Sequence, residues 1–345
     1  MKVAVLMSGG VDSSVVSYLL LKAGFEVKGV FIKMYPQSLR CSDEALNKAK
    51  EFSNRLNFPF YVFNAEDIFR KKVIQYFITS YENGFTPNPC VVCNKYIKFG
   101  LFLNYAINEL NVDFIASGHY ARIRKENNRY LLLKGTDPLK DQSYMLYTLT
   151  QDVLSRLIFP LGEYKKDDVK RIALDLAINF DFGKESEDLC FVNKDYKSFL
   201  KKYIAPKKGK IVSVTGEVLG EHEGIHLFTI GQREGLGISS SRPLYVIELD
   251  SKNNIVKVGP KSEAYKKDLI VENINLIPFD SLEEETKLTA KVRYRGEEKP
   301  CIAKKQENYL YVTFLEPQLA ITPGQSIVFY NNDIVIGGGT IKEVL

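Results

Sequence analysis

Apolar and polar positions in the first 120 residues follow the pattern of a parallel α/β sheet. Four apolar runs have strand length: residues 3–7, 27–34, 58–63 and 113–116. The segments between the first three have the helical pattern, at residues 14–20 and 43–56. Strands that alternate with helices predict a doubly wound parallel sheet, with the ligand site at the carboxyl ends of the strands.

The later part of the chain has a different pattern of apolar and polar residues. Residues 121–135 predict a hairpin around Glu126-Asn127-Asn128, and residues 137–176 predict a loop followed by helices. Near Pro206 the pattern changes to short alternating runs with frequent glycine, and evenly spaced short strands from Leu269 onward predict a small barrel. We predict three domains: an α/β domain at residues 1–205, a small mostly-β central domain at 206–267, and a C-terminal β-barrel at 268–345.

A glycine turn connects the first strand to the first helix. Its sequence, Ser8-Gly9-Gly10-Val11-Asp12-Ser13, places successive backbone N–H groups at a helix N-terminus, where they attract phosphate. It lacks the Walker lysine and the Gly-x-Gly-x-x-Gly spacing, which disfavours a P-loop kinase or a dinucleotide fold. The turn resembles the PP-loop of adenine nucleotide hydrolase-like proteins, which cut ATP between its α and β phosphates and pass AMP to an acceptor.

Composition and charge narrow the class of protein. The 345 residues are 45% hydrophobic and 26% charged, which is typical of a globular chain with two or three cores. Since no apolar run approaches the ~20 residues that span a bilayer, and five cysteines in a chain of this length argue against a secreted disulfide scaffold, we expect a cytoplasmic protein with no membrane partner.

The net charge of +5 is unevenly distributed. Residues 1–206 carry 29 Lys and Arg against 23 Asp and Glu, whereas residues 207–345 carry 18 against 19. Any electrostatic attraction for RNA would therefore come mainly from the N-terminal part. A charge of this size is equally compatible with an ordinary solvated surface.

Cysteines in two distant segments are candidates for covalent chemistry. Cys90 and Cys93 follow Thr86-Pro87-Asn88-Pro89, which predicts an extended loop that ends as a helix begins near Asn94. A thiol at a helix N-terminus beside two lysines ionises more readily than an isolated cysteine, and is a candidate nucleophile. Cys190, taken alone, is better explained as a small buried apolar residue. Cys41 and Cys301 are expected to be structural.

With these residues the chain resembles the tRNA-specific 2-thiouridylase family from end to end. The resemblance rests on ordered blocks of sequence: Ser8 to Ser13, Thr86 to Pro89 with Cys93-Asn94 and Ile97-Lys98-Phe99, Ser117-Gly118-His119-Tyr120, Lys140 to Tyr144, Cys190-Phe191, Thr229 to Arg233 with Gly235-Leu236-Gly237, Arg293-Tyr294-Arg295, Pro300-Cys301, Thr322 to Gln325, and Gly337-Gly338-Gly339.

The resemblance implies an ATP-dependent sulfurtransferase. Members use ATP and Mg²⁺ to adenylate the C2 oxygen of the wobble uridine, U34, in tRNAs for Lys, Glu and Gln. Sulfur then displaces AMP to give 2-thiouridine, so that AMP and pyrophosphate are released. By resemblance, Cys190 carries the sulfur as a persulfide supplied by a sulfur-carrier protein or a cysteine desulfurase. Cys93 attacks or resolves it, which leaves a Cys93–Cys190 disulfide to be reduced.

The resemblance also implies binding residues. The nucleotide, with Mg²⁺ near Asp12, would be held by Leu6, Met7, Ser8, Gly9, Gly10, Val11, Asp12, Ser13, Ile32 and Gly118. The tRNA and its flipped-out base would be bound by Asn88, Pro89, Cys90, His119, Lys140, Asp141, Gln142, Arg293, Tyr294 and Gln325. His119 has an alternative explanation as a structural histidine, and Arg293 and Arg295 as a solvated barrel face. The acidic run at residues 283–285 lends RNA binding no support.

Two positions depart from the family pattern. Cys90 stands where an aspartate is often found, so a carboxylate acid/base is not assured there, and Asp188 stands where a glycine is expected. Cys90 also opens a rival mechanism, in which Cys90, Cys93 and Cys190 ligate a [4Fe–4S] cluster that has one open iron. Zinc is disfavoured, because no fourth ligand is evident.

Two other functional classes remain open at this point. A PP-loop amidotransferase or ligase that adenylates a non-RNA substrate would use the loop but leave the cysteine pair idle. A non-catalytic RNA-binding protein would use the barrel but leave the loop idle, and it would not release pyrophosphate.

Overall fold

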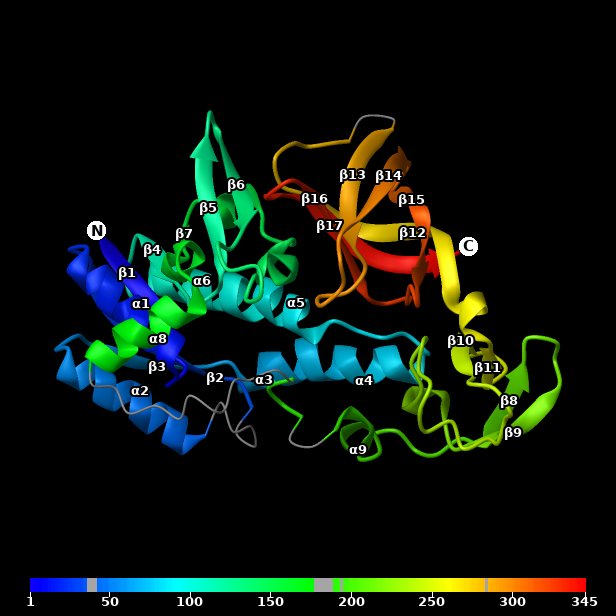
Figure 1. Ribbon diagram of the computed structural model, residues 1–345. Coiled ribbons are helices and arrows are strands. Elements are labelled where there is room, and N and C mark those ends of the chain that lie inside the picture. Colours follow the sequence, from blue (N-terminus) through cyan, green and yellow to red (C-terminus); the bar gives the residue numbers. More distant parts are fainter. Residues whose placement is uncertain (36–41, 177–188, 193–194, 283–284) are drawn as a thin grey trace.

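The N-terminal part is a parallel sheet covered by helices on both faces (Figure 1). The computed structural model describes residues 1–35, 42–176, 189–192, 195–282 and 285–345. The sheet has the order β3-β2-β1-β4-β7, with every pairing parallel. Its strands are β1 (Lys2–Leu6), β2 (Glu26–Lys33), β3 (Phe60–Asn64), β4 (Phe114–Ala116) and β7 (Leu157–Ile158).

Alternate residues of β1 face two different cores. Val3 and Val5 pack in the core beneath one set of helices: α1 (Val11–Lys22), α2 (Asp43–Arg55) and α8 (Lys166–Asp175). Ala4 packs in the other core, beneath the helices between β3 and β4. Because β2 and β4 flank β1 on opposite sides, the strand order reverses at β1, and such a reversal is where α/β sheets bind ligands.

The helices between β3 and β4 form two long rods, and each contains a π-helical stretch. The first rod comprises α3 (Glu66–Phe69), η2 (Arg70–Ile74) and α4 (Gln75–Glu82). The second comprises α5 (Pro89–Cys93), η3 (Asn94–Leu101) and α6 (Phe102–Asn108). The first rod runs from the sheet toward the other two domains (Figure 1). The rods therefore connect the nucleotide loop region with the rest of the molecule.

The predicted hairpin is present, and it also extends the barrel. Strands β5 (Ala121–Glu126) and β6 (Arg129–Lys134) pair around Asn127, whose φ is +51°. The six barrel strands close through the β12–β17 pairing, and β6 joins them through β17. The barrel strands are β12 (Tyr265–Leu276), β13 (Thr286–Lys291), β14 (Lys299–Gln306), β15 (Tyr309–Leu319), β16 (Ser326–Asn331) and β17 (Ile334–Val344).

The central domain is a four-stranded sheet beside the barrel, with the order β10-β11-β8-β9. It consists of β8 (Gly209–Ser213), β9 (Val218–His222), β10 (Tyr245–Asp250) and β11 (Ile255–Gly259). The remaining short helices are η4 (Ser143–Leu146), α7 (Gln151–Leu154), η5 (Pro160–Glu163), α9 (Tyr196–Leu200), η6 (Ile225–Leu227) and η7 (Lys261–Ala264). The predicted fold class is thus confirmed, while the exact domain limits at residues 205/206 and 267/268 stay predictions.

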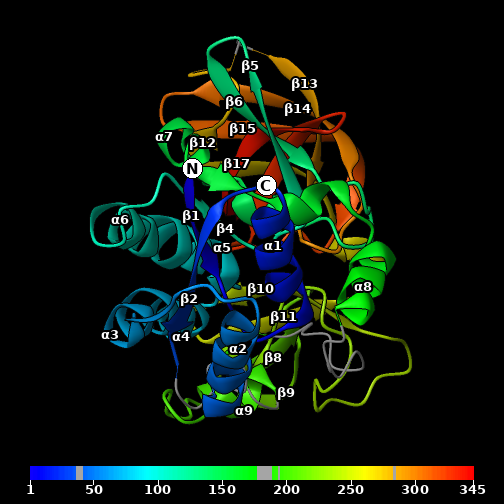
Figure 2. The same ribbon diagram turned by 90° about the vertical axis from the view of Figure 1, so that its left-hand side faces the viewer.

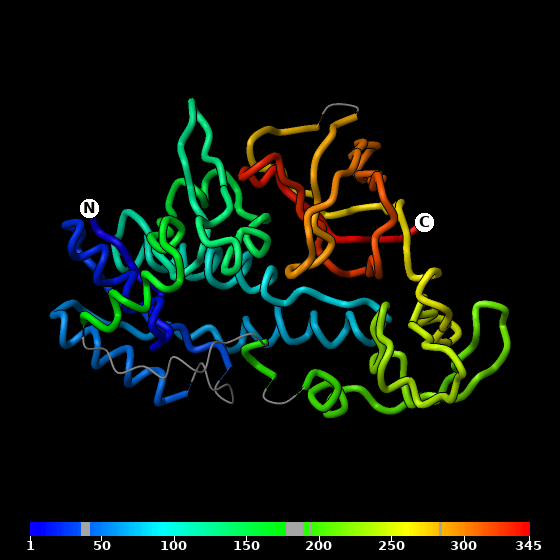
Figure 3. The backbone as a smooth tube through the Cα atoms, viewed as in Figure 1, coloured from blue at the N-terminus to red at the C-terminus, as the bar shows by residue number. Residues whose placement is uncertain are grey.

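The barrel is packed against the α/β domain and shares a core with it. Val328, Tyr330 and Val335 of the barrel belong to the same hydrophobic cluster as the long helical rods. Asn275 of β12 donates to the carbonyls of Tyr147 and Leu149, at 2.7 and 3.1 Å. Figures 2 and 3 show the barrel above the helical layer in two orientations. We conclude that the barrel and the α/β domain are packed together as one unit.

Candidate active site

The Ser8-Gly9-Gly10 turn is locked by its own hydrogen bonds. The Ser8 N–H donates to Ser13 Oγ at 3.2 Å, and Ser13 Oγ donates to the Gly10 carbonyl at 3.0 Å. Gly9 has φ +72°, and a Cβ built on it would lie 2.3 Å from the carbonyl oxygen of Ala45. Only glycine fits there. The first N–H groups of α1 follow this turn, at the positive end of the helix dipole, which suits an anion.

Residues from three strands meet at this edge of the sheet, as the sequence predicts. Ile32 is buried near the end of β2, next to β1. A Cβ built on Gly118, just past β4, would lie 3.0 Å from Asp12 Cβ. Leu6, Met7 and Val11 pack their side chains into the two cores, so they offer a ligand mainly backbone atoms.

The carboxylate of Asp12 has two partners that sequence reasoning missed. Lys166, the first residue of α8, donates to Asp12 Oδ1 at 2.8 Å and Oδ2 at 2.9 Å. The hydroxyl of Tyr120 donates to Oδ1 at 2.8 Å. Tyr120 belongs to the Ser117–Tyr120 block, which was noted without a role for Tyr120. Lys166 is remote from every motif, so no sequence signal pointed to it.

Cys93 lies at the end of α5, near the carboxyl end of β2. The predicted helix start near Asn94 is wrong: the helix begins at Pro89, because Asn88 Oδ1 accepts the Val91 N–H at 3.4 Å and caps it. Cys90 is therefore in the first turn and exposed, whereas Cys93 is buried one turn later. Its Sγ donates to Met34 Sδ, immediately after β2, at 3.8 Å. Cys90 is thus closer than Cys93 to the positive end of the helix dipole.

Cys190 is half-buried and packs against the same hydrophobic cluster that contains Cys93. It lies in a turn in which the Val192 N–H donates to the Leu189 carbonyl at 3.0 Å. The next residue, Phe191, anchors the turn by packing edge-on against Phe69 and Phe77, with ring centroids 5.9 and 5.2 Å apart. Both predicted catalytic thiols therefore border the same hydrophobic core, and their roles in sulfur transfer stay predictions.

The segment before α5 is held by a barrel loop. The Thr86 N–H donates to the Pro323 carbonyl at 3.0 Å, and Gln325 Nε2 donates to the Pro87 carbonyl at 3.3 Å. A Cβ on Gly324 would lie 2.8 Å from Phe85 Cβ. Gln325, predicted to bind tRNA, thus also fixes the loop that precedes Asn88 and Pro89, both of which are buried.

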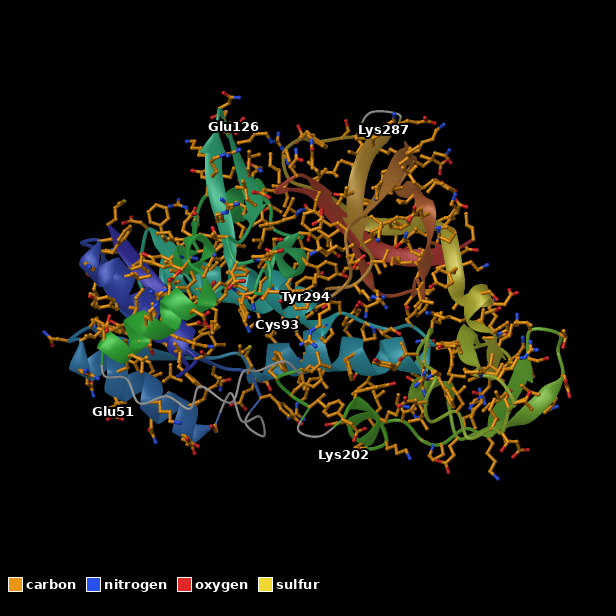
Figure 4. The ribbon with its side chains drawn as sticks, viewed as in Figure 1. Glu51, Cys93, Glu126, Lys202, Lys287 and Tyr294 are labelled. Carbon is orange, nitrogen blue, oxygen red and sulfur yellow. The ribbon has the colours of Figure 1, made fainter. Side chains whose placement is uncertain are left out.

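A second barrel loop reaches the same place. Tyr294 follows β13 and packs against the cluster that contains Cys93, and Figure 4 labels both residues at this junction. Its ring centroid lies 6.0 Å from that of Tyr144. Burial, together with the nearby Asp141 and Cys90, raises the pKa of Tyr294. Arg293 and Arg295, on either side of it, are exposed.

The remaining predicted tRNA-binding residues surround this junction but also support the backbone. Asp141 accepts the Gly135 and Ser143 N–H groups at 3.0 and 3.1 Å, and Gln142 Oε1 accepts the Tyr120 N–H at 3.1 Å. Lys140 beside them is half-buried. Their proposed contacts with RNA stay predictions.

His119 is a packed histidine. Its Nδ1 lies 2.7 Å from Ser117 Oγ, and its ring packs against both Phe99 and Phe159, with centroids 5.5 and 5.7 Å away. Burial, together with the charge of Lys98, lowers the pKa of His119 well below its usual value of 6.5. The ring is therefore neutral at physiological pH, and its contact with tRNA stays a prediction.

A metal cluster is not favoured by the described residues. Among them, no three His, Cys, Asp or Glu side chains form a group able to hold a metal ion. Cys90, Cys93 and Cys190 therefore do not form such a group in the described part of the chain, and the [4Fe–4S] cluster stays a prediction. Burial raises the pKa of Cys301, in β14, to about 12, consistent with a structural role. The expectations for Cys41, Asp188, Glu283 and Glu284 lie outside the described residues.

Three family models match the chain in order. They are described as a tRNA methyl transferase HUP domain at residues 1–194, a tRNA methyl transferase PRC-barrel domain at 197–260 and an aminomethyltransferase beta-barrel domain at 266–341. The chain is 46% identical to the tRNA-specific 2-thiouridylase MnmA 1 of Caldanaerobacter subterraneus subsp. tengcongensis, over 99% of this chain and 98% of the relative. It belongs to the tRNA-specific 2-thiouridylase family.

Other members of the 2-thiouridylase family match it equally completely. The chain is 45% identical to MnmA 2 of Thermoanaerobacter sp. strain X514, over 100% of this chain and 98% of the relative. It is 44% identical to MnmA of Clostridium acetobutylicum, over 99% of both chains. Within the described residues, the helices are too short or too polar to cross a membrane.

Proposed function

We propose that this protein is an ATP-dependent tRNA 2-thiouridylase acting on the wobble uridine, U34. The observation that carries the proposal is the position of Cys93, whose Sγ lies 3.8 Å from the Sδ of Met34, the residue that follows β2. The nucleotide loop follows β1, the strand that pairs with β2. The proposed phosphate-binding loop and the Cys93 thiol therefore lie toward the same edge of one sheet. Membership of the 2-thiouridylase family supports the same reaction.

The residues at the loop suit ATP with Mg²⁺. The backbone N–H groups that follow Gly10 would bind phosphate oxygens, and the Asp12 carboxylate would hold the ion. Bound there, Mg²⁺ would supply charge neutralisation for phosphoryl transfer. The protein's own part would be to fix the loop geometry and to line the adenine and ribose with Ile32 and Gly118, where an added Cβ would lie 3.0 Å from Asp12 Cβ.

The proposed chemistry then proceeds in three steps. The C2 oxygen of uracil attacks the α-phosphate, the bond to the bridging oxygen breaks, and its electron pair leaves with pyrophosphate. The terminal sulfur of a Cys190 persulfide next attacks C2, and AMP leaves with the C2 oxygen. Cys93 finally attacks the Cys190 sulfur, so that a Cys93–Cys190 disulfide forms and the electron pair of the broken S–S bond goes to the thiocarbonyl sulfur.

A sulfur-carrier protein or cysteine desulfurase would reload Cys190 after a thiol reductant has opened this disulfide. The substrate uridine would be flipped out of the anticodon loop of tRNAs for Lys, Glu and Gln. Asn88, Pro89 and Cys90 would face the base, while Tyr294 and Gln325 would contact the tRNA from the barrel. The exposure of Cys90 and the convergence of the two barrel loops on this segment support that placement.

The deciding experiment is mass spectrometry of nucleosides from tRNA treated with the protein, ATP, Mg²⁺ and a sulfide source. The expected product is a uridine whose oxygen has been replaced by sulfur, formed only when both ATP and Cys190 are present. A methylated nucleoside would instead support the activity named in the first two family models. A protein that releases pyrophosphate with a small-molecule acceptor, independently of Cys190, would be a ligase or amidotransferase.

A further inference from the structure

The ion pair between Lys166 and Asp12 is built into the fold. Both carboxylate oxygens accept from the Lys166 ammonium, at 2.8 and 2.9 Å, and the ammonium lies 5.7 Å from the centre of the Tyr120 ring. Only 13% of the Lys166 side chain is exposed, against 34% for Asp12. Surface ion pairs are usually mobile and contribute little. This one is shielded, doubly bonded and fixed at the start of a helix.

The pair sits where a polyphosphate must bind. Asp12 lies in the first turn of α1, directly after the glycine turn. An unneutralised carboxylate there would repel a phosphate chain, whereas an adjacent ammonium removes that repulsion. Oδ1 already accepts from both Lys166 and Tyr120, while Oδ2 accepts from Lys166 in the contacts described. A carboxylate oxygen has two lone pairs, so Oδ2 retains capacity for a metal ion.

We propose that Lys166 is a catalytic residue that binds the pyrophosphate half of ATP, an inference that rests on the proposed function. In the nucleotide-free protein its ammonium neutralises Asp12. With Asp12 holding a magnesium ion, the Lys166 ammonium would instead donate to an oxygen of the β or γ phosphate. It stays protonated there and stabilises the negative charge that pyrophosphate gains as the bond to the α phosphorus breaks.

The choice of the pyrophosphate half follows from charge. Pyrophosphate carries more negative charge than the adenylate that stays with the substrate, and it gains more as the bond breaks. A lysine ammonium is a compact point charge that suits such a group. The loop itself has no lysine, so Lys166 supplies from α8 the cation that its sequence lacks.

The test compares K166M with K170M, a control on the same helix. Lys170 is 38% exposed and lies 3.8 Å from Asp167, so its loss removes the same charge away from the loop. Isothermal titration calorimetry in the presence of Mg²⁺ measures the affinity of each variant for ATP, for pyrophosphate and for AMP in separate titrations. In K166M, affinity for ATP and pyrophosphate is expected to fall by about 10- to 100-fold, as for a lost charged hydrogen bond, while affinity for AMP changes less than about twofold. K170M is expected to match wild type for all three ligands.

A second comparison excludes a purely structural role, in which Lys166 only holds Asp12 in place. In a D12N background the ion pair is already broken, so K166M should still weaken pyrophosphate binding if Lys166 contacts phosphate. Equal pyrophosphate affinity for D12N and D12N/K166M would overturn the inference, as would equal losses for AMP and ATP in K166M. If wild type and K166M showed the expected binding but wild type did not thiolate tRNA, the proposed function would fail and this inference would stand.

Discussion

The nucleotide loop and the thiol junction are built in opposite ways. The loop is a run of consecutive residues, and the hydrogen bonds that close its glycine turn join positions no more than five apart, although its Asp12 also accepts from Tyr120 and Lys166. The junction is assembled from α5, the Cys190 turn and two barrel loops, and its contacts join residues up to 238 positions apart. The turn itself can therefore form where β1 and α1 form, whereas the junction exists only when the barrel has docked. Substitutions in the loop should therefore affect ATP binding, whereas substitutions in the junction should affect sulfur transfer and tRNA binding.

The largest expected effect is on sulfur transfer alone. Cys190→Ser and Cys93→Ser should each lower the rate of tRNA thiolation by at least about a thousandfold, because a serine oxygen neither carries nor resolves a persulfide. Binding of Mg²⁺–ATP, measured by calorimetry, should stay within about twofold of wild type. Cys301→Ser, in the barrel core, is the control and should retain thiolation in the folded protein. Full activity in Cys190→Ser would contradict the proposed division of roles.

Next in size is a change confined to the loop. Gly9→Ala forces a Cβ to 2.3 Å from the Ala45 carbonyl oxygen at a φ of +72°. It should lower the free energy of unfolding by about 2 to 5 kcal/mol and should also weaken ATP binding. Gly24→Ala has a similar φ of +82° but meets no atom within 4 Å. It should cost about 1 kcal/mol by denaturant unfolding. Equal costs for the two variants would show that backbone strain, not the contact with α2, decides the effect.

A smaller change should weaken the junction without touching the loop. Asn275→Ala removes two hydrogen bonds between β12 and the α/β domain, and should cost about 1 to 3 kcal/mol of unfolding free energy. We expect tRNA affinity to fall while ATP affinity is unchanged, since the barrel carries part of the proposed tRNA surface. Asn308→Ala, in the exposed turn before β15, should change stability by less than about 0.5 kcal/mol. A parallel loss of ATP affinity in Asn275→Ala would show that the two regions are coupled.

The smallest expected effect is a pH dependence of overall stability, to which histidines of the α/β domain and of the central domain contribute. Burial lowers the pKa of His119, His222 and His226 below the usual 6.5. Below pH 6.5 the unfolded chain therefore binds protons that the folded chain does not, so the free energy of unfolding should fall with decreasing pH. Urea unfolding at about pH 7.5 and about pH 5.5 measures this. His119→Gln should reduce the slope, and a stability that rises on acidification would contradict it.

Sequence reasoning succeeded where structure is local. The Ser8–Ser13 turn, the parallel strands whose carboxyl ends form one edge of the sheet, and the hairpin around Asn127 are all predicted from neighbouring residues. It misplaced the start of the helix that carries Cys93, because Asn88 caps a helix at Pro89 although the two prolines suggested an extended loop. Capping by a single side chain decided that boundary.

Long-range contacts were beyond the sequence. Nothing near Lys166 marks it as the partner of Asp12, 154 positions away, and the family blocks give no sign that Gln325 fixes the carbonyl of Pro87. Tyr120 was visible as part of a block, but the direction of its hydroxyl depends on how α1 packs beside β4. These contacts are set by tertiary packing, which spacing along the chain does not encode.

The union of the β5–β6 hairpin with the barrel limits how this chain can be recombined. Lys134 at the end of β6 pairs with Glu298 at 2.6 Å and donates its N–H to the Asp333 carbonyl at 2.9 Å. Arg122 of β5 pairs with Asp333 at 3.1 Å. A chimera that exchanges only the C-terminal barrel between relatives would mismatch this seam and leave an open strand edge. Functional exchange of the barrel therefore requires residues 121–134 to be inherited with it.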